Sequence, residues 1–123
     1  MSNSFVIAEF LSRQYNNSIV IVLDRVPIET FTKGLFSRFY KVYYFTEYNL
    51  DLISDLLVDN INVSVRSFDD IIDIPKLINN SNLSPVLLTS NLYNNIQKYS
   101  IKLINEYSIK NYYIDDIKNN YYE

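Results

Sequence analysis

The sequence predicts a three-layer α/β/α domain built on a mostly parallel five-stranded sheet. Short apolar segments typical of buried strands alternate with longer segments whose apolar residues recur every three or four positions, as in amphipathic helices. Each connection between strands is also long enough to hold a crossover helix, which parallel pairing requires. A chain of 123 residues with 48% hydrophobic residues can bury a normal core, so we expect one domain over 1–123.

The first half of the chain contains two predicted strands. A helix over 4–15 has a broad apolar face, and the core over 18–114 follows it. Ser18–Leu23 holds five consecutive apolar residues, mostly β-branched, which indicates a strand covered on both faces. A proline suits the first turn of a helix over Ile28–Tyr40. KVYYFT then predicts a strand over Lys41–Thr46, and an asparagine caps a helix over Leu50–Val58.

The second half contains three more predicted strands. Apolar and polar residues alternate over Ile61–Val65, as in a strand. Ser and Asp residues precede a helix over Ile71–Asn79, which we expect to bend or break at its proline. The remaining predicted elements are a strand over Val86–Ser90, a helix over Leu92–Tyr107, a strand over Ser108–Ile114 and a polar, Tyr-bearing tail over 115–123.

Composition and charge exclude several classes of function. The chain has no Cys and no His, which excludes disulfide bonds, thiolate metal sites, histidine-based triads and most zinc sites. A net charge of −3 with Lys and Arg scattered singly is not typical of a domain that binds nucleic acid by itself. No apolar run reaches the length of a membrane-spanning helix. We therefore expect an intracellular protein, in the cytoplasm or nucleus, that uses no metal, cofactor or membrane.

The segment after the first strand occupies the place where nucleotide-binding α/β proteins keep their phosphate-binding turn. Its sequence, LDRVPIET, contains no glycine, although such turns use glycine for close backbone approach to the ligand. We treat it as a degenerate nucleotide-loop region made of Asp24, Arg25, Val26, Pro27, Ile28, Glu29 and Thr30. Asp24 and Arg25 are typical of a solvated pair in a turn, and a ligand contact is the alternative.

Segments taken in order resemble the core of the RecA/RadA-like recombinase superfamily over about residues 5–91. In that family a short helix precedes a Ser-Ile-hydrophobic strand, the phosphate loop, a helix and a strand of the type V-x-Y-I-D-T-E. Here Ser18–Val22 is similar to the first strand, and KVYYFTE (Lys41–Glu47) to the second. NINVSVRSF (Asn60–Phe68) and PVLLTS (Pro85–Ser90) are similar to two later strands. The resemblance implies a RecA-like or Rossmann-like fold.

The chain departs from this family where the family keeps its chemistry. A working phosphate loop needs G-x-x-x-x-G-K-[ST], and here Glu29 or Thr30 stands where the lysine belongs. Thr89 replaces the Asp that ends the metal-binding strand. Glu47 remains, at the position of the family's water-activating carboxylate, although it also suits a polar strand end. The resemblance therefore implies a non-catalytic paralogue, with Glu47, Thr89 and Ser90 as vestigial strand-end positions.

Such a paralogue would work by protein contact as a subunit of a homologous recombination or DNA-repair complex. The implied partner is a recombinase or another paralogue subunit, and DNA would be reached only through the complex. Tyrosines near the C-terminus are hard to bury in so small a domain, and tyrosine is favoured at interfaces. The expected interaction surface is Tyr112, Tyr113, Tyr121 and Tyr122.

Three local patterns leave alternatives open. Thr89-Ser90-Asn91 is typical of a helix cap, and a phosphate contact is the alternative. Asp69-Asp70-Asp73 fits acidic charge in the first turn of a helix better than a metal site. The aromatic residues of 40–48 fit the core and rim of a strand, with base stacking as the alternative.

Other functions compete with the accessory role. A ligand-sensing Rossmann-like domain, resembling the nucleotide-sensing domains of CRISPR-associated regulators, would use Asp24–Thr30 and Thr89–Asn91, although such sensors usually keep a glycine after the fourth strand. A receiver-like domain lacks the phospho-acceptor Asp after Ile61–Val65. A hydrolase or transferase would have to work without His, Cys, a glycine loop or a metal cluster.

Overall fold

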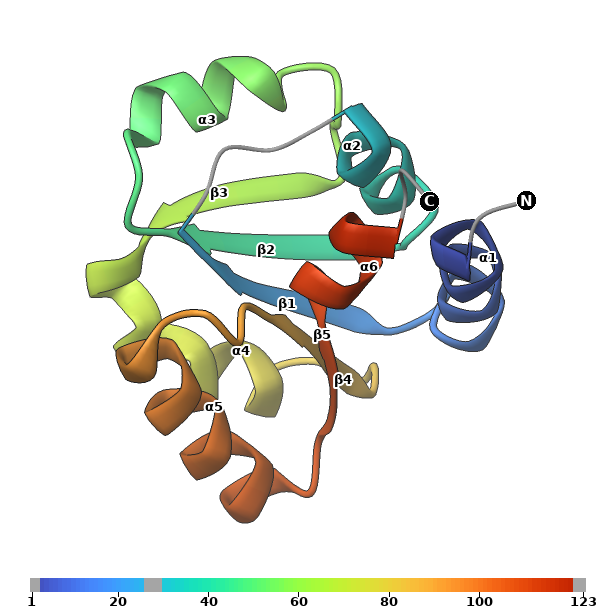
Figure 1. The fold of residues 1–123 in the computed structure, drawn as a ribbon. Helices are drawn as coiled ribbons and strands as arrows, with labels where there is room; N and C mark the ends of the chain where they lie inside the picture. The colour runs from blue at the N-terminus through green and yellow to red at the C-terminus, as the bar shows by residue number, and fades with distance from the viewer. Residues whose placement is uncertain (1–2, 26–29, 121–123) are drawn as a thin grey trace.

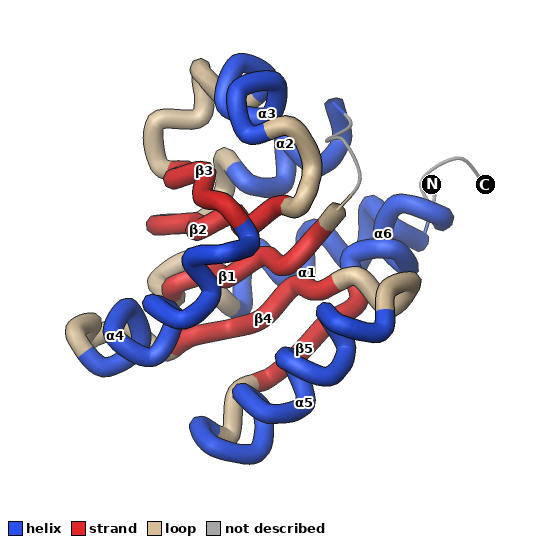
Figure 2. The backbone as a smooth tube through the Cα atoms, turned by 90° about the vertical axis from the view of Figure 1, so that its left-hand side faces the viewer, coloured by secondary structure: helices blue, strands red, loops and turns tan. Residues whose placement is uncertain are grey.

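The computed structural model describes residues 3–25 and 30–120 and confirms the predicted α/β architecture. Its sheet has five strands, all parallel, in the order β3-β2-β1-β4-β5 (Figure 2). This is the order of doubly wound Rossmann-type sheets, in which the chain changes direction between β1 and β4. The strands are β1 (Ile19–Asp24), β2 (Lys41–Thr46), β3 (Val63–Ser67), β4 (Pro85–Thr89) and β5 (Lys110–Tyr113).

Helices cover both faces of the sheet and make the three layers seen in Figure 1. Alternate residues of β1 supply the two cores: Val20 and Val22 pack into one, and Ile19, Ile21 and Leu23 into the other. All six residues of β1 are buried, which explains why its first five are apolar; the sixth is Asp24. One face carries α1 (Asn3–Gln14), α2 (Thr30–Phe36), α3 (Leu50–Leu56) and α6 (Ile114–Asn120); the other carries the 3-10 helix η1 (Phe68–Asp73), α4 (Ile74–Asn79) and α5 (Asn94–Tyr107). No helix in the described part of the chain is both long enough and apolar enough to span a bilayer.

The prediction for α2 and β3 was wrong at their boundaries, and two asparagines explain the end of α2. The helix ends at Phe36 because the Asn62 amide donates hydrogen bonds of 2.9 and 2.8 Å to the carbonyls of Phe36 and Phe39. The Asn60 amide similarly binds the Lys33 carbonyl at 3.0 Å. β3 starts at Val63 and not at residue 61, and the asparagine side chains before it are bonded to the α2 region.

The segment over Ile71–Asn79, which was expected to bend or break at its proline, is divided between two helices, with the break just before Pro75. The η1 helix begins after Ser67, whose hydroxyl accepts a hydrogen bond from the Asp69 amide at 3.2 Å. Pro75 lies in the first turn of α4, where its missing N–H costs no intrahelical hydrogen bond. The proline therefore starts a helix instead of interrupting one.

The C-terminal region differs most from the prediction. Residue 108 was expected to start a strand, but Ser108 ends α5 in the left-handed conformation, with φ 54° and ψ 42°, and β5 begins at Lys110. The expected polar tail over 115–123 is helical as far as Asn120, and residues 121–123 lie outside the described residues. Ile114 and Ile117 explain the helix, because both are buried in the core that α1 also lines.

Candidate functional site

Polar side chains gather at the carboxyl ends of the parallel strands, which is where open α/β sheets place ligands. The first is Asp24, which is fully buried and so is not the solvated turn residue that the sequence predicts. Its carboxylate accepts hydrogen bonds from the Arg25 amide at 2.7 Å and from the Tyr44 hydroxyl at 3.1 Å. Burial, with the nearby Asp24 charge and this hydrogen bond, raises the pKa of Tyr44 well above its ordinary value. Tyr44 thus remains a proton donor to the carboxylate.

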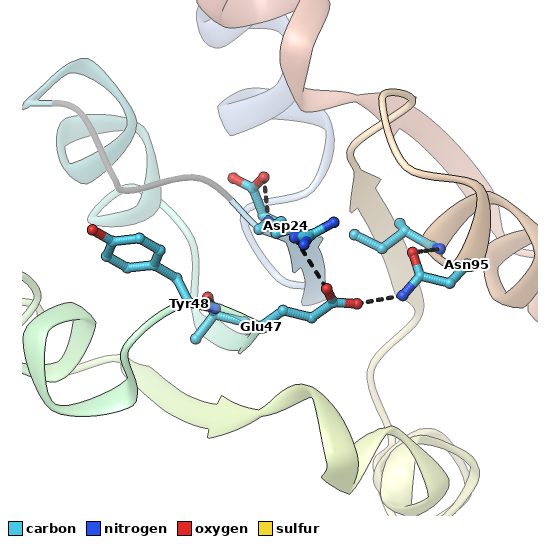
Figure 3. A network of polar contacts seen from close by, with 7 residues as sticks. Asp24, Glu47, Tyr48 and Asn95 are labelled. Atoms are coloured by element: carbon cyan, nitrogen blue, oxygen red, sulfur yellow. Dashed lines mark hydrogen bonds and ion pairs between the residues drawn. The ribbon is translucent and has the colours of Figure 1, made fainter.

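Glu47 connects the ends of β1 and β2 to the start of α5 (Figure 3). One carboxylate oxygen lies 3.2 Å from Nε of Arg25, and the other accepts a hydrogen bond from the Asn95 amide. The Arg25 guanidinium also lies 4.8 Å from the centre of the Tyr93 ring, within cation–π range. Each oxygen of the Glu47 carboxylate therefore has a partner within the chain.

The polar groups at the end of β4 are also hydrogen-bonded to other groups of the chain. The Ser90 amide donates to the Leu23 carbonyl at 2.9 Å, so β1 and β4 stay hydrogen-bonded beyond the last residue of β4. The Ser90 hydroxyl and the Asn91 amide both donate to Oδ2 of Asp115, at 2.8 and 2.7 Å. The Thr89 hydroxyl donates to Oδ1 of Asn111 at 2.9 Å. The expected helix-cap role was wrong, since α5 starts at Asn94 with residue 93 as its N-cap.

A pocket of about 400 Å³ opens at the carboxyl ends of β2 and β3. Its polar lining residues are Thr46, Glu47, Tyr48, Ser67, Asp69 and Asn95, and its apolar ones are Leu50 and Phe68. The Thr46 hydroxyl accepts a hydrogen bond from the Tyr48 amide at 2.9 Å, which fixes the turn after β2. Two carboxylates favour a neutral or cationic ligand with hydroxyl donors over a phosphate.

The two described tyrosines of the predicted interaction surface, Tyr112 and Tyr113, have different environments. The Tyr112 hydroxyl lies 2.9 Å from the Tyr15 hydroxyl, their rings meet edge to face, and Tyr112 packs against the core. Burial and this hydrogen bond raise the pKa of Tyr15 to about 12. Tyr113 is 43% exposed, while Tyr121 and Tyr122 lie outside the described residues.

Of the nucleotide-loop region, Val26, Pro27, Ile28 and Glu29 also lie outside the described residues, and Thr30 is the exposed first residue of α2. The described residues form no group of three or more carboxylates that could hold a metal ion.

Sequence reasoning missed Tyr44, Asn95, Asn111 and Asp115 as members of this edge. For Asp115 a signal existed: Ile114 and Ile117 are spaced as on one face of a helix, with acidic residues in its first turn. For the others no local pattern points to the contact, because each partner is distant in sequence.

Comparisons with protein-family models, with curated proteins and with solved structures found no match.

Proposed function

We propose that this protein is a non-catalytic interaction subunit, an accessory protein of a homologous recombination or DNA-repair complex. The observation that supports it best is the internal bonding of the carboxyl edge of the sheet. Glu47 is held by Arg25 and Asn95, and Ser90 is held by Asp115. Contacts of this kind hold the side chains to one another across the strand ends, which suits a structural role at this edge. The role in recombination rests on the resemblance of the strands to the RecA/RadA-like family.

The strand at the β3 edge offers a partner surface. Among the described residues β3 is hydrogen-bonded to β2 alone, and its own five residues are all half-buried. Six of the eleven large hydrophobic side chains that the structure shows exposed lie between residues 48 and 72, in the segments flanking this strand. Ile61 before β3 is 95% exposed and Ile72 after it is 78% exposed. An unpaired edge with apolar flanks is a surface on which another chain can add a strand.

Affinity capture from the source cell, with mass spectrometry and size-exclusion light scattering, tests this function. We expect a RecA-type recombinase or a second paralogue in a stoichiometric complex. Ile61→Asp combined with Ile72→Asp should abolish that complex. The control is Ile101→Asp, a change on α5 at a side chain that is 57% exposed, and it should leave the complex intact. A stable monomer without such a partner, or tight binding of Mg-ATP, would overturn the proposal.

A ligand-sensing role is the second candidate, and the pocket beside Glu47 is the observation that favours it. In dinucleotide-binding domains an acidic residue at this place in the fold binds the ribose hydroxyls. The pocket's two carboxylates and two hydroxyls suit a nucleoside more than a phosphate. Thermal stabilisation by nucleosides or cyclic oligonucleotides, lost in Asp69→Asn and Glu47→Gln, would favour sensing. Absence of any shift would leave the interaction role as the stronger one.

A further inference from the structure

A second pocket lies at the opposite edge of the sheet, at the amino ends of β1 and β2. Its volume is about 300 Å³, at the lower end of the range for small-ligand sites. Lys41, the first residue of β2, and Lys76 of α4 line it together with Tyr40 and Tyr43. Leucine and isoleucine side chains complete the wall, so the pocket combines positive charge with apolar surface.

Neither lysine of this pocket forms an ion pair with a described side chain. The ion pairs among the described side chains involve Arg13, Arg25 and Arg38, each with a glutamate elsewhere on the molecule. None of the ion pairs in the described part of the chain includes Lys41 or Lys76. In a protein of net charge −3, two unpaired ammonium groups beside one hollow make a local positive potential that favours an anion.

A third cation, Arg66, lies against the ring of Tyr43, as Lys41 does. Lys41 Nζ is 5.2 Å and Arg66 Cζ is 5.3 Å from the centre of the Tyr43 ring. Arg66 has no carboxylate partner among the described side chains, and its Nε is buried without a hydrogen-bond partner there. Arg66 does not line the pocket, but its guanidinium adds positive charge beside the Tyr43 ring, which does line it, and so strengthens the local potential that favours an anion.

Tyr40 gives the pocket a planar, accessible surface. Its side chain is 67% exposed, whereas Tyr44 and Phe45 of the same aromatic run are fully buried. The run therefore divides into core residues and a ring that is free to stack. Exposed aromatic rings next to lysines are the combination by which proteins bind single nucleotides and single strands.

We propose that this pocket binds a nucleotide, with the phosphate between Lys41 and Lys76 and the base against Tyr40. The proposal is independent of the accessory role, because the pocket lies at the other edge of the sheet from the carboxyl-edge groups and does not include the flanks of β3. A free mononucleotide and a nucleotide within a single strand present the same chemistry, so the test must separate these two sources.

Fluorescence anisotropy with a labelled oligothymidylate, followed over a range of salt concentrations, is the test. We expect Lys41→Gln with Lys76→Gln to weaken binding at least tenfold at low salt. The magnitude of the slope of log K against log salt should fall by about 0.7, since the two lysines hold one phosphate and each phosphate contact on a single strand contributes about 0.7. The matched control is Lys98→Gln with Lys102→Gln, which removes the same charge from exposed positions of α5 and should leave the slope unchanged.

Tyr40→Ala separates stacking from charge, because it should weaken binding about tenfold without changing the salt slope. Competition by thymidine monophosphate at concentrations comparable to those of the strand identifies a free nucleotide as the ligand. Failure of the mononucleotide to compete identifies the single strand. The proposal is overturned if neither probe binds at low salt, or if the α5 control weakens binding as much as the pocket variant.

Discussion

Removal of the Asp115 carboxylate tests whether the closed carboxyl edge stabilises the fold. Asp115 is 4% exposed and accepts two hydrogen bonds, from the Ser90 hydroxyl and the Asn91 amide. A hydrogen bond to a charged group contributes about 1.5–3 kcal/mol, and Asp115→Ala leaves both donors without this acceptor. The variant also removes the cost of burying a carboxylate, so we expect a net loss of about 2–4 kcal/mol. That is a large share of the roughly 5–15 kcal/mol typical of a small domain.

Urea denaturation followed by far-ultraviolet circular dichroism measures this loss. The control is Asp116→Ala, because the neighbouring residue shares the first turn of α6 but is exposed. It should cost at most about 1 kcal/mol, the size of a helix-dipole interaction. A double-mutant cycle with Ser90→Ala should give a coupling of about 1 kcal/mol or more. Equal losses at the two aspartates, or no coupling to Ser90, would refute the structural role of this hydrogen-bonded group.

Three further changes test other parts of the fold. Tyr44→Phe should destabilise the protein by about 1–3 kcal/mol in urea titrations, because it removes a hydrogen bond to the buried Asp24, whereas Tyr43→Phe should cost less than about 0.5 kcal/mol. The pKa of Tyr15 is raised from 10.0 to about 12, so the folded state holds this proton more tightly than the unfolded state does. The contribution of the Tyr15 proton to the free energy of unfolding should be complete below pH 10 and should fall as the pH rises toward 12. The urea midpoint of Tyr15→Phe should therefore depend less on pH in that range than the midpoint of the unchanged protein does. Ser108→Gly should raise the free energy of unfolding by about 0.5–1 kcal/mol, since glycine adopts the left-handed conformation at this C-cap without strain; an unchanged or lower midpoint would contradict this reasoning.

The sequence was most informative where the core alone decides the structure. β2 runs over Lys41–Thr46 as predicted, because its apolar residues are buried by both helical layers. The sequence was least informative where contacts with residues distant in the chain determine where an element ends. The end of α2 depends on amides of Asn60 and Asn62, which lie on a later connection. The left-handed cap at Ser108 could not be foreseen, because glycine normally signals it.

In the candidate site, too, some features could be predicted from the sequence and others could not. The strand ends at Glu47, Thr89 and Ser90 follow from the strand predictions, since carboxyl ends of parallel strands share one edge. Their partners do not follow, because Asn95 and Asp115 meet them only through tertiary packing. A prediction of solvated or vestigial residues was therefore natural, although the structure gives each of these side chains a defined partner.

The two edges of the sheet differ in how their charges are compensated, and this difference indicates where a ligand can gain free energy. At the carboxyl edge, Arg25 already neutralises Glu47, so an incoming charged group would have to displace an existing contact. At the amino edge, Lys41 and Lys76 form no ion pair among the described side chains, so an anion would gain attraction without breaking one. Salt should therefore weaken anion binding at the amino edge strongly, whereas stability at the carboxyl edge, where hydrogen bonds to Asp115 are buried, should respond little to salt. If salt reduced the stability at the carboxyl edge as strongly as it reduced anion binding at the amino edge, charge compensation would not be what distinguishes the two edges.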